Sequence, residues 1–300
     1  MNRRRALAAG LSAAAIYSVA GRACAEPQPG TSNIARFEQT APFPVNAYIV
    51  EGADGIAVID ATLTHSSSLA LRAKVDAMGK PLKGVLLTHA HPDHYAGLGN
   101  LTSGLDVPIV SVEGVREIAK RDDATKDAII GGMFGAEWPS NRVFPNEIVR
   151  DGGNVSFGAG LDFEVRDIGP AESFHDSMFV LKGEQQRVFA GDLAYGLMHP
   201  YMADNTNPEW RAALDGIRLE LAEDAVLYVG HGAPVTPGFL AWQKDYLSVF
   251  ERVLADQDWT DRDAAVSNVS QTMRAYLPND DLSFLMELSV LPNAERLGLI

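Results

Sequence analysis

Short runs of apolar residues separated by turn residues dominate the first half of the chain, a pattern typical of β-strands. Two such runs, Ala47–Val50 and Ile56–Asp60, flank the turn residues Gly52–Gly55 and predict a hairpin. Ser66–Met78 then has apolar residues at helical spacing behind serines that can cap a helix. Apolar runs also predict strands at Val85–Leu87 and Pro108–Val112, and a further helix is expected at Glu113–Arg121.

The second half repeats this succession of strands and helices. Residues 122–150, between the halves, lack a clear period and place Met133, Phe134 and Trp138 among glycines and prolines. They predict an irregular segment, either a substrate lid or a surface excursion packed by its own aromatic residues. Two strand-rich halves, each with helices, predict two sheets packed face to face with helices outside. Further strands are expected at Leu161–Ile168, Met178–Lys182, Arg187–Ala190 and Val226–Val229, and helices at Pro208–Leu221 and from Phe239 onward.

Residues 1–25 predict a signal peptide. They begin with Arg3, Arg4 and Arg5, continue with an Ala-rich apolar run, and end in Ala23-Cys24-Ala25, a small-x-small cleavage pattern. The run is shorter than the roughly 20 residues of a membrane span, and the consecutive arginines resemble a twin-arginine export signal. We therefore expect a periplasmic or secreted protein without stable membrane insertion after removal of the signal. An uncleaved N-terminal anchor is the alternative.

Charge and cysteine content narrow the classes of partner. The chain has 25 basic and 39 acidic residues and a net charge of −14. Residues 1–25 contain four arginines and no acid, so residues 26–300 have 21 basic and 39 acidic residues, a net charge of −18. This charge disfavours nucleic acid and anionic lipid as partners. The one cysteine, Cys24, belongs to the predicted signal, so neither a disulfide nor a thiol nucleophile is expected in the mature protein.

The segment THAHPDHYAG, residues 88–97, concentrates potential metal ligands directly after a predicted buried strand. His89, His91 and His94 are three of the seven histidines of the chain, and Asp93 lies among them. In an extended segment alternate residues share a face, so His89, His91 and Asp93 are expected on one side and His94 on the other. One loop can thus supply two neighbouring metal positions. Neutral imidazoles with a carboxylate are a ligand set that suits zinc.

The His-x-His-x-Asp-His pattern of residues 89–94 resembles that of the metallo-β-lactamase-fold hydrolases. Later residues match the family in order: Asp192 has the place of its bridging carboxylate, His231 that of its final histidine, and Asp60 that of an aspartate supporting the metal loop. The resemblance covers most of residues 34–255. It implies an α+β fold, a four-layer αββα sandwich with a two-metal site at the rim between the sheets, and one catalytic domain over residues 26–300.

One position departs from the family pattern. The chain reads Pro170-Ala171-Glu172-Ser173 where the family usually has Pro-Gly-His-Thr. Glu172 is the favoured ligand because the flanking strands keep register with it, and His175 is the alternative through a shifted loop. A glutamate adds negative charge, which would weaken the bound metal as a Lewis acid.

The resemblance implies a division of roles among these residues. His89, His91 and Glu172 would hold the first of two Zn²⁺ ions, Asp93, His94 and His231 the second, and Asp192 would bridge them around a shared hydroxide. Asp93 would also pass a proton to the leaving group. Tyr195 has the spacing from Asp192 that acyl-homoserine lactonases use to place a phenol on the substrate carbonyl. A tyrosine simply packed at a strand end is the alternative for Tyr195.

The sequence therefore predicts a dinuclear zinc hydrolase that cleaves an ester, lactone or amide bond of a small-molecule substrate. The alternatives are a single-iron persulfide dioxygenase, a β-lactamase in the strict sense, and a metal-binding protein without turnover. His91 argues against diiron oxygen-reducing relatives, which typically have glutamate there. Asp192 argues against the broad-spectrum β-lactamases, which usually have cysteine or serine at that position. The substrate and the oligomeric state stay open.

Overall fold

The computed structural model describes residues 33–300, and the predicted signal peptide lies outside them. Two β-sheets form the centre of the molecule. The six-stranded first sheet has the order β1 (Asn33–Gln39), β2 (Val45–Glu51), β3 (Ile56–Ile59), β4 (Leu82–Leu86), β5 (Ile109–Ser111) and β6 (Glu147–Ile148). The five-stranded second sheet has the order β11 (Val226–Gly232), β10 (Arg187–Gly196), β9 (Asp176–Leu181), β8 (Asp162–Gly169) and β7 (Asn154–Ser156).

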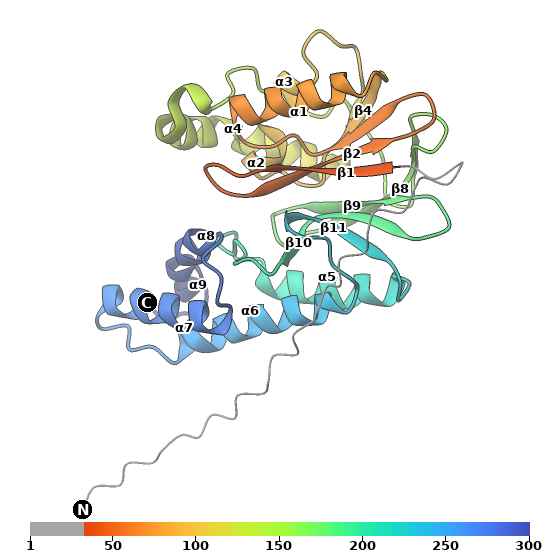
Figure 1. The fold of residues 1–300 in the computed structure, drawn as a ribbon. Helices are drawn as coiled ribbons and strands as arrows, with labels where there is room; N and C mark the ends of the chain where they lie inside the picture. Colours follow the sequence, from red (N-terminus) through yellow and green to blue (C-terminus); the bar gives the residue numbers. More distant parts are fainter. Residues whose placement is uncertain (1–32) are drawn as a thin grey trace, which may run out of the picture.

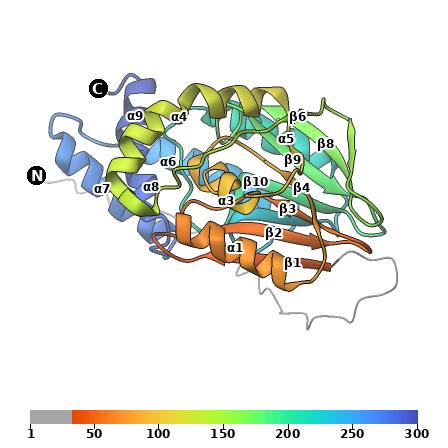
Figure 2. The same cartoon turned by 90° about the horizontal axis from the view of Figure 1, so that it is seen from above.

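Helices cover the outer faces of both sheets and complete four layers (Figure 1). The first sheet is covered by α1 (His65–Ala77), α3 (Leu98–Leu101) and α4 (Glu113–Phe134), and the second by α5 (Asn207–Glu220) and α6 (Phe239–Ala255). Seen from above, α7 (Arg262–Tyr276), α8 (Ser283–Leu288) and α9 (Val290–Arg296) gather at one end of the sandwich (Figure 2). The predicted αββα architecture is confirmed.

Aromatic side chains fill the space between the two sheets. Phe163, Phe179 and Phe189 of the second sheet are almost fully buried. The ring centroid of Phe189 lies 5.7 Å from that of Tyr48 on β2 and 5.1 Å from that of Tyr228, on which it stacks. Burying one such side chain stabilises the fold by roughly 1.5–3 kcal/mol, so these contacts contribute much of the attraction between the layers.

Polar contacts also join the sheets, at the end where β2 faces β11. The side chain of Asn46 donates to the carbonyl oxygens of Val229 (2.9 Å) and Gly232 (2.8 Å). The hydroxyl of Tyr48 donates to the same Val229 carbonyl at 2.7 Å. Both side chains are buried, where an unpaired polar group would cost about 1–3 kcal/mol. These hydrogen bonds therefore fix β11 against the first sheet.

The structure corrects the prediction for residues 122–150. Residues 122–134 continue the helix that was expected to end at Arg121, so α4 spans Glu113–Phe134 and a short 3-10 helix, η1 (Gly135–Glu137), follows. Of the side chains of α4 only Val115 and Ala119 are buried. The helix thus lacks the wide apolar stripe by which a core-facing helix is recognised in a sequence, and Gly131 and Gly132 further obscure it.

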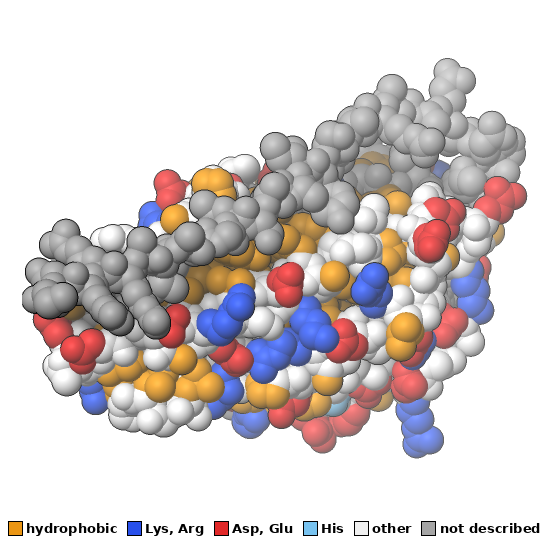
Figure 3. All heavy atoms as spheres, turned by 90° about the horizontal axis from the view of Figure 1, so that it is seen from below, with side chains coloured by type: hydrophobic (Ala, Val, Ile, Leu, Met, Phe, Trp, Pro, Cys, Tyr) orange, Lys and Arg blue, Asp and Glu red, His pale blue; other side chains and the backbone are white. Residues whose placement is uncertain are grey.

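The outer face formed by α5 and α6 is mixed in charge. Figure 3 shows acidic and basic side chains interspersed there with apolar ones. Lys244 on α6 pairs with Asp215 on α5 at 2.5 Å, and Arg211 pairs with Glu251 at 2.8 Å. An exposed pair such as Lys244–Asp215 contributes about 0–1 kcal/mol. Over the described part of the chain, no helix has both the length and the apolar character needed to cross a membrane.

Candidate metal centre

The histidine segment follows β4 and contains a short helix, α2 (Pro92–Tyr95). The backbone is extended through His91, which is the residue before the helix. From Pro92 on the chain is helical, so the expectation that Asp93 shares a face with His89 and His91 is wrong. The carboxylate of Asp93 instead lies 3.7 Å from Nε2 of His94 and 3.2 Å from Nε2 of His231.

Asp60 supports this segment from the end of β3. Its carboxylate accepts hydrogen bonds from the backbone N–H and the hydroxyl of Thr88, both at 2.9 Å. It also lies 2.9 Å from Nδ1 of His94. The backbone of Asp60 is left-handed, with φ of 62°, a conformation that aspartate adopts more readily than most residues. The contact with Nδ1 leaves Nε2 of His94 facing the centre of the site, and Asp60 thus contacts the segment as the resemblance implied.

One cluster of potential ligands consists of His89, His91, Glu172 and Asp192, whose nitrogen and oxygen atoms lie within 4.8 Å of one another. The Oε2 atom of Glu172 is 3.1 Å from Nδ1 of His91 and 3.8 Å from Nε2 of His89. The Oδ2 atom of Asp192 is 3.9 Å from Nε2 of His89. We call this set the first cluster.

The structure places Glu172, and not His175, in the first cluster. Glu172 is fully buried, whereas His175 is partly exposed and its Nε2 lies 2.7 Å from Asp167. The turn that separates them is fixed by Asp176, which accepts hydrogen bonds from the backbone N–H and the hydroxyl of Ser173 at 2.8 and 3.1 Å. His175 thus points away, and the favoured alternative of the sequence matches the geometry.

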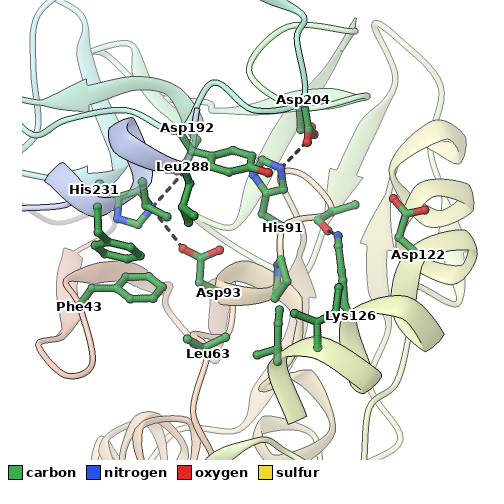
Figure 4. A pocket seen from close by; sticks show the side chains of 18 of the residues that line it. Phe43, Leu63, His91, Asp93, Asp122, Lys126, Asp192, Asp204, His231 and Leu288 are labelled. Atoms are coloured by element: carbon green, nitrogen blue, oxygen red, sulfur yellow. Dashed lines mark hydrogen bonds and ion pairs between the residues drawn. The ribbon is translucent and has the colours of Figure 1, made fainter. Parts of the chain in front are cut away.

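The second cluster consists of Asp93, His94 and His231, again with potential ligand atoms within 4.8 Å. Asp192 faces both clusters (Figure 4), because its Oδ1 lies 3.3 Å from Nε2 of His94 and its Oδ2 lies 3.1 Å from Nε2 of His231. Asp192 and His231 belong to β10 and β11, which continue past their predicted ends. Both sheets therefore bring potential ligands to one place, and Asp192 lies between the two clusters.

The chemistry of these atoms fits divalent cations. Four buried polar atoms converge here within ion-pair distance but make no well-aligned hydrogen bond: His89 Nε2, His94 Nε2, Glu172 Oε2 and Asp192 Oδ1. Each would cost about 1–3 kcal/mol if it stayed unsatisfied, and imidazole nitrogens with carboxylate oxygens are ligands that zinc and similar metals accept. The residues of both clusters therefore fit metal ions.

The backbone of β11 approaches the clusters closely at Gly230. A Cβ atom at this position would lie 1.9 Å from Oδ1 of Asp192 and 2.6 Å from Cε1 of His94. Both distances are far below van der Waals contact, so any side chain would displace a ligand. Glycine is required here by the close packing of the site.

Burial and neighbouring charges shift the pKa values of the site. Burial raises the pKa of Glu172 to about 8. Burial alone would lower the pKa of His231, but the carboxylates of Asp192 and Asp93 raise it to about 10. Burial works against the charge of Asp192 as well, yet His231 and His94 hold its pKa well below the usual range. Binding of a cation by these residues would therefore release protons from Glu172 and His231.

Tyr195 contacts the carboxylates of the site. Its hydroxyl lies 2.7 Å from Oδ2 of Asp192 and 2.9 Å from Oε1 of Glu172. Its ring stacks on that of His231, with centroids 5.0 Å apart, because the two residues are paired on the parallel strands β10 and β11. The hydroxyl thus helps to position two potential ligands, and the contact of Tyr195 with substrate stays a prediction.

Two polar residues beside the clusters were not assigned from the sequence. The carboxylate of Asp204 lies 3.2 Å from Nε2 of His91. Lys126 on α4 donates to the carbonyl of Ala90 at 2.7 Å and lines the space over the site. Neither residue belongs to a motif, and Asp204 is 113 positions from His91, so no local spacing signals the contact.

A cavity of about 340 Å³ opens above the clusters, and Asp93, Asp192 and His231 are among the residues that line it. We call it the α4–α8 cavity, because these two helices form its apolar walls. Helix α4 contributes Ile118, Ile129, Ile130, Met133 and Phe134, and α8 contributes Phe284, Leu285 and Leu288. The part of residues 122–150 that lies over the site is thus one side of a helix.

We compared the sequence of the chain with those of known proteins. The sequence model of the metallo-beta-lactamase superfamily matches residues 40–231. YobT of Bacillus subtilis (strain 168) is 48% identical over 59 residues, 20% of this chain and 25% of YobT. The linear primary-alkylsulfatase of a Pseudomonas species is 22% identical over 228 residues, 63% of this chain and 33% of the relative. The matches therefore span a third or less of these curated relatives.

Solved structures match the fold over most of both chains. A metallo-beta-lactamase family protein from Thermus thermophilus has a TM-score of 0.62 and 22% identity, with 90% of this chain and 95% of that chain covered. A beta-lactamase domain protein from Burkholderia ambifaria has a TM-score of 0.60 and 18% identity, with coverage of 91% and 88%. At these identities the likeness shows a common fold.

Proposed function

Because the chain belongs to the metallo-beta-lactamase superfamily, we propose that it is a metal-dependent hydrolase that cleaves an ester, lactone or amide bond of a small molecule. The observation that carries the proposal is the pair of facing clusters that share Asp192 beneath a cavity open to substrate. Two zinc ions are the proposed cofactors, since the ligand set combines imidazoles and carboxylates without a thiolate.

Divalent cations at such a site supply Lewis acidity and make water a usable nucleophile near neutral pH. For an ester, the oxygen of water bonds to the acyl carbon and the bond between the acyl carbon and the alcohol oxygen breaks. One proton of water leaves with the alcohol, and the other leaves with the acid. Asp93 lines the cavity, and we assign to its carboxylate the transfer of the proton to the leaving oxygen.

The residues around the ligands hold this arrangement. Asp60 orients His94, Asp204 contacts the outer nitrogen of His91, and Tyr195 contacts two carboxylates. Outer contacts of this kind fix the ring orientation of a ligating histidine and raise its basicity. Both clusters thus have outer contacts that support metal binding, and the cavity above them favours turnover over a role in metal binding alone.

Sulfate-ester cleavage is a second candidate function. It is favoured by the match over 228 residues to a linear primary-alkylsulfatase together with the apolar walls of the α4–α8 cavity. The same clusters would serve, with the sulfur atom in the place of the acyl carbon.

The test is to load the purified protein with zinc and to measure metal content and hydrolysis. The substrate panel contains lactones, aryl esters, thioesters, β-lactams and alkyl sulfates. We expect about two zinc ions per chain and turnover of at least one class. His89→Ala and Asp192→Ala are expected to lose metal and at least about 100-fold in kcat/KM, more than an outer contact usually costs.

The matched control is His175→Ala, which removes a histidine outside both clusters and should keep both metal and activity. Full activity in a metal-free His89→Ala protein would contradict the proposal. Iron in place of zinc, with consumption of oxygen by the loaded protein, would favour the dioxygenase alternative.

A further inference from the structure

Exposed apolar side chains gather at the mouth of the α4–α8 cavity. On α4, Met133 is 72% exposed and Ile129 is 59% exposed, and on α8 Leu288 is 61% exposed. Phe174 and Phe284 are also exposed and also line the cavity. Large apolar groups that cluster around a hollow in this way mark a surface that binds apolar ligands.

The apolar surface continues from this mouth to the reacting groups. The ring of Phe284 lies 5.5 Å from that of Phe43, and the ring of Phe43 lies 6.4 Å from that of His231. Leu63, which is buried, lines the same side of the cavity. A hydrocarbon chain that enters between α4 and α8 would thus be in contact with apolar groups until it reaches the second cluster.

The opposite side of the cavity, along α4, carries polar groups among its apolar ones. Figure 4 shows Phe43, Leu63 and Leu288 on the side of Asp93 and His231, and Asp122, Lys126 and Asp204 on the side of His91. Asp204 lies at His91, and Lys126 donates to the carbonyl of the neighbouring Ala90. The cavity is therefore apolar around Phe43, Leu63 and Leu288 and carries polar groups among the apolar residues of α4 on the side of His91, which suits a molecule with an apolar and a polar part.

We propose that the substrate is an amphiphile whose hydrocarbon chain lies along Phe43, Phe284 and Leu288, with the bond to be cleaved over Asp192. This inference rests on the proposed function and names its substrate class. The polar part of the molecule lies on the side of His91, Lys126 and Asp204.

The first experiment measures chain-length dependence. Zinc-loaded protein is assayed with the p-nitrophenyl esters of acetic, butyric, hexanoic and octanoic acid, which share one leaving group. Each buried methylene should raise kcat/KM about threefold to fourfold until the cavity is filled. A flat series, or one that falls with chain length, would overturn the inference.

The second experiment tests whether the hydrocarbon chain of the substrate lies in the α4–α8 cavity. Met133→Gln and Leu288→Gln change exposed side chains at the mouth, so both variants should fold. The ratio of kcat/KM for octanoate to that for acetate should fall about fivefold to tenfold in each. Leu219→Gln is the matched control, because Leu219 on α5 is 89% exposed and outside the cavity, and its ratio should equal that of the parent. Equal ratios in all three variants would overturn the inference.

A binding measurement separates this inference from the proposed function. Titration calorimetry with 1-hexanol and 1-octanol does not require turnover. Octanol should bind more tightly than hexanol, and this difference in affinity should be smaller in Leu288→Gln. If no member of the substrate panel is cleaved but this pattern holds, the proposed function fails and the apolar subsite stands. If esters are cleaved without a preference for chain length, only the inference fails. A parent dimer that Leu288→Gln dissociates would show that a second copy covers the mouth, which would also overturn it.

Discussion

His91 is held from two sides by carboxylates. Its Nδ1 lies 3.1 Å from Oε2 of Glu172 in the first cluster, and its Nε2 lies 3.2 Å from Oδ2 of Asp204 at the edge of the cavity. A carboxylate behind a ligating imidazole fixes the tautomer and the orientation of the ring. Asp204 is therefore placed to orient the ring of His91 from outside the first cluster.

Asp204→Asn should weaken metal binding while the fold is kept. The amide has the size of the carboxylate but no charge, and loss of such an outer contact typically costs 10–100-fold in metal affinity. Competition with a chelator of known affinity measures the effect. Asp122→Asn is the control, because Asp122 also lines the cavity but pairs with Arg121. Equal zinc affinities in the two variants would show that Asp204 does not support metal binding through His91.

At the scale of residues, the sequence predicted the groups that local spacing reveals. The cluster of His89, His91, Asp93 and His94 is visible as a motif, and the structure brings Glu172, Asp192 and His231 to it. The choice between Glu172 and His175 depended on the turn made by Ser173 and Asp176, which no spacing encodes. Asp204 was missed because its contact joins residues far apart in the chain.

Helix α4 shows where prediction fails at the scale of elements. Sequence patterns identify helices by the side that they bury in the core, and α4 buries only Val115 and Ala119. Its other large apolar residues line the α4–α8 cavity and stay partly or fully exposed. The helix α1 was predicted almost to its ends. Its N-terminus is capped by Thr64, and its apolar residues Leu71 and Val75 are buried in the core.

Gly132 in α4 offers a test of this helix. A Cβ at Gly132 would meet no atom within 4 Å, so Gly132→Ala should raise the free energy of unfolding by about 0.5–1 kcal/mol. Gly131→Ala should gain less, because its Cβ would lie 3.1 Å from Cδ1 of Trp138. Urea denaturation measures both, with Gly216→Ala in the equally open α5 as reference. Destabilisation by Gly132→Ala alone would contradict a helix that continues to Phe134.

For the whole molecule, the metal-free site makes stability depend on pH. The pKa of Glu172 is raised from 4.5 to about 8 and that of His231 from 6.5 to about 10. A raised pKa stabilises the fold fully below the ordinary value and loses this effect as the pH rises through the shifted value. The pKa of Asp192 is lowered, so its contribution is lost only in acid. The metal-free protein should therefore lose stability between about pH 4.5 and 10.

The stabilisation of the fold by zinc should increase with pH, opposite to the stability of the metal-free protein. Zinc binds the deprotonated ligands, so proton competition at Glu172 and His231 weakens its binding in acid. We expect the rise in melting temperature caused by zinc, relative to protein treated with a chelator, to be larger at about pH 8.5 than at about pH 6. Differential scanning fluorimetry at the two pH values gives the comparison. A zinc effect that is independent of pH would show that these residues are not the ligands.

The polar contacts of β2 with β11 determine which parts of the molecule can open. Asn46 and Tyr48 hold the carbonyls next to His231, and the carbonyl of Pro44 lies 2.6 Å from Nδ1 of His231 itself. Parting of the layers at this edge would break several buried hydrogen bonds at once. We therefore expect this edge of the sandwich to open only at a high cost in free energy, so that a ligand is admitted by displacement of α4 and α8, which form the walls of the cavity.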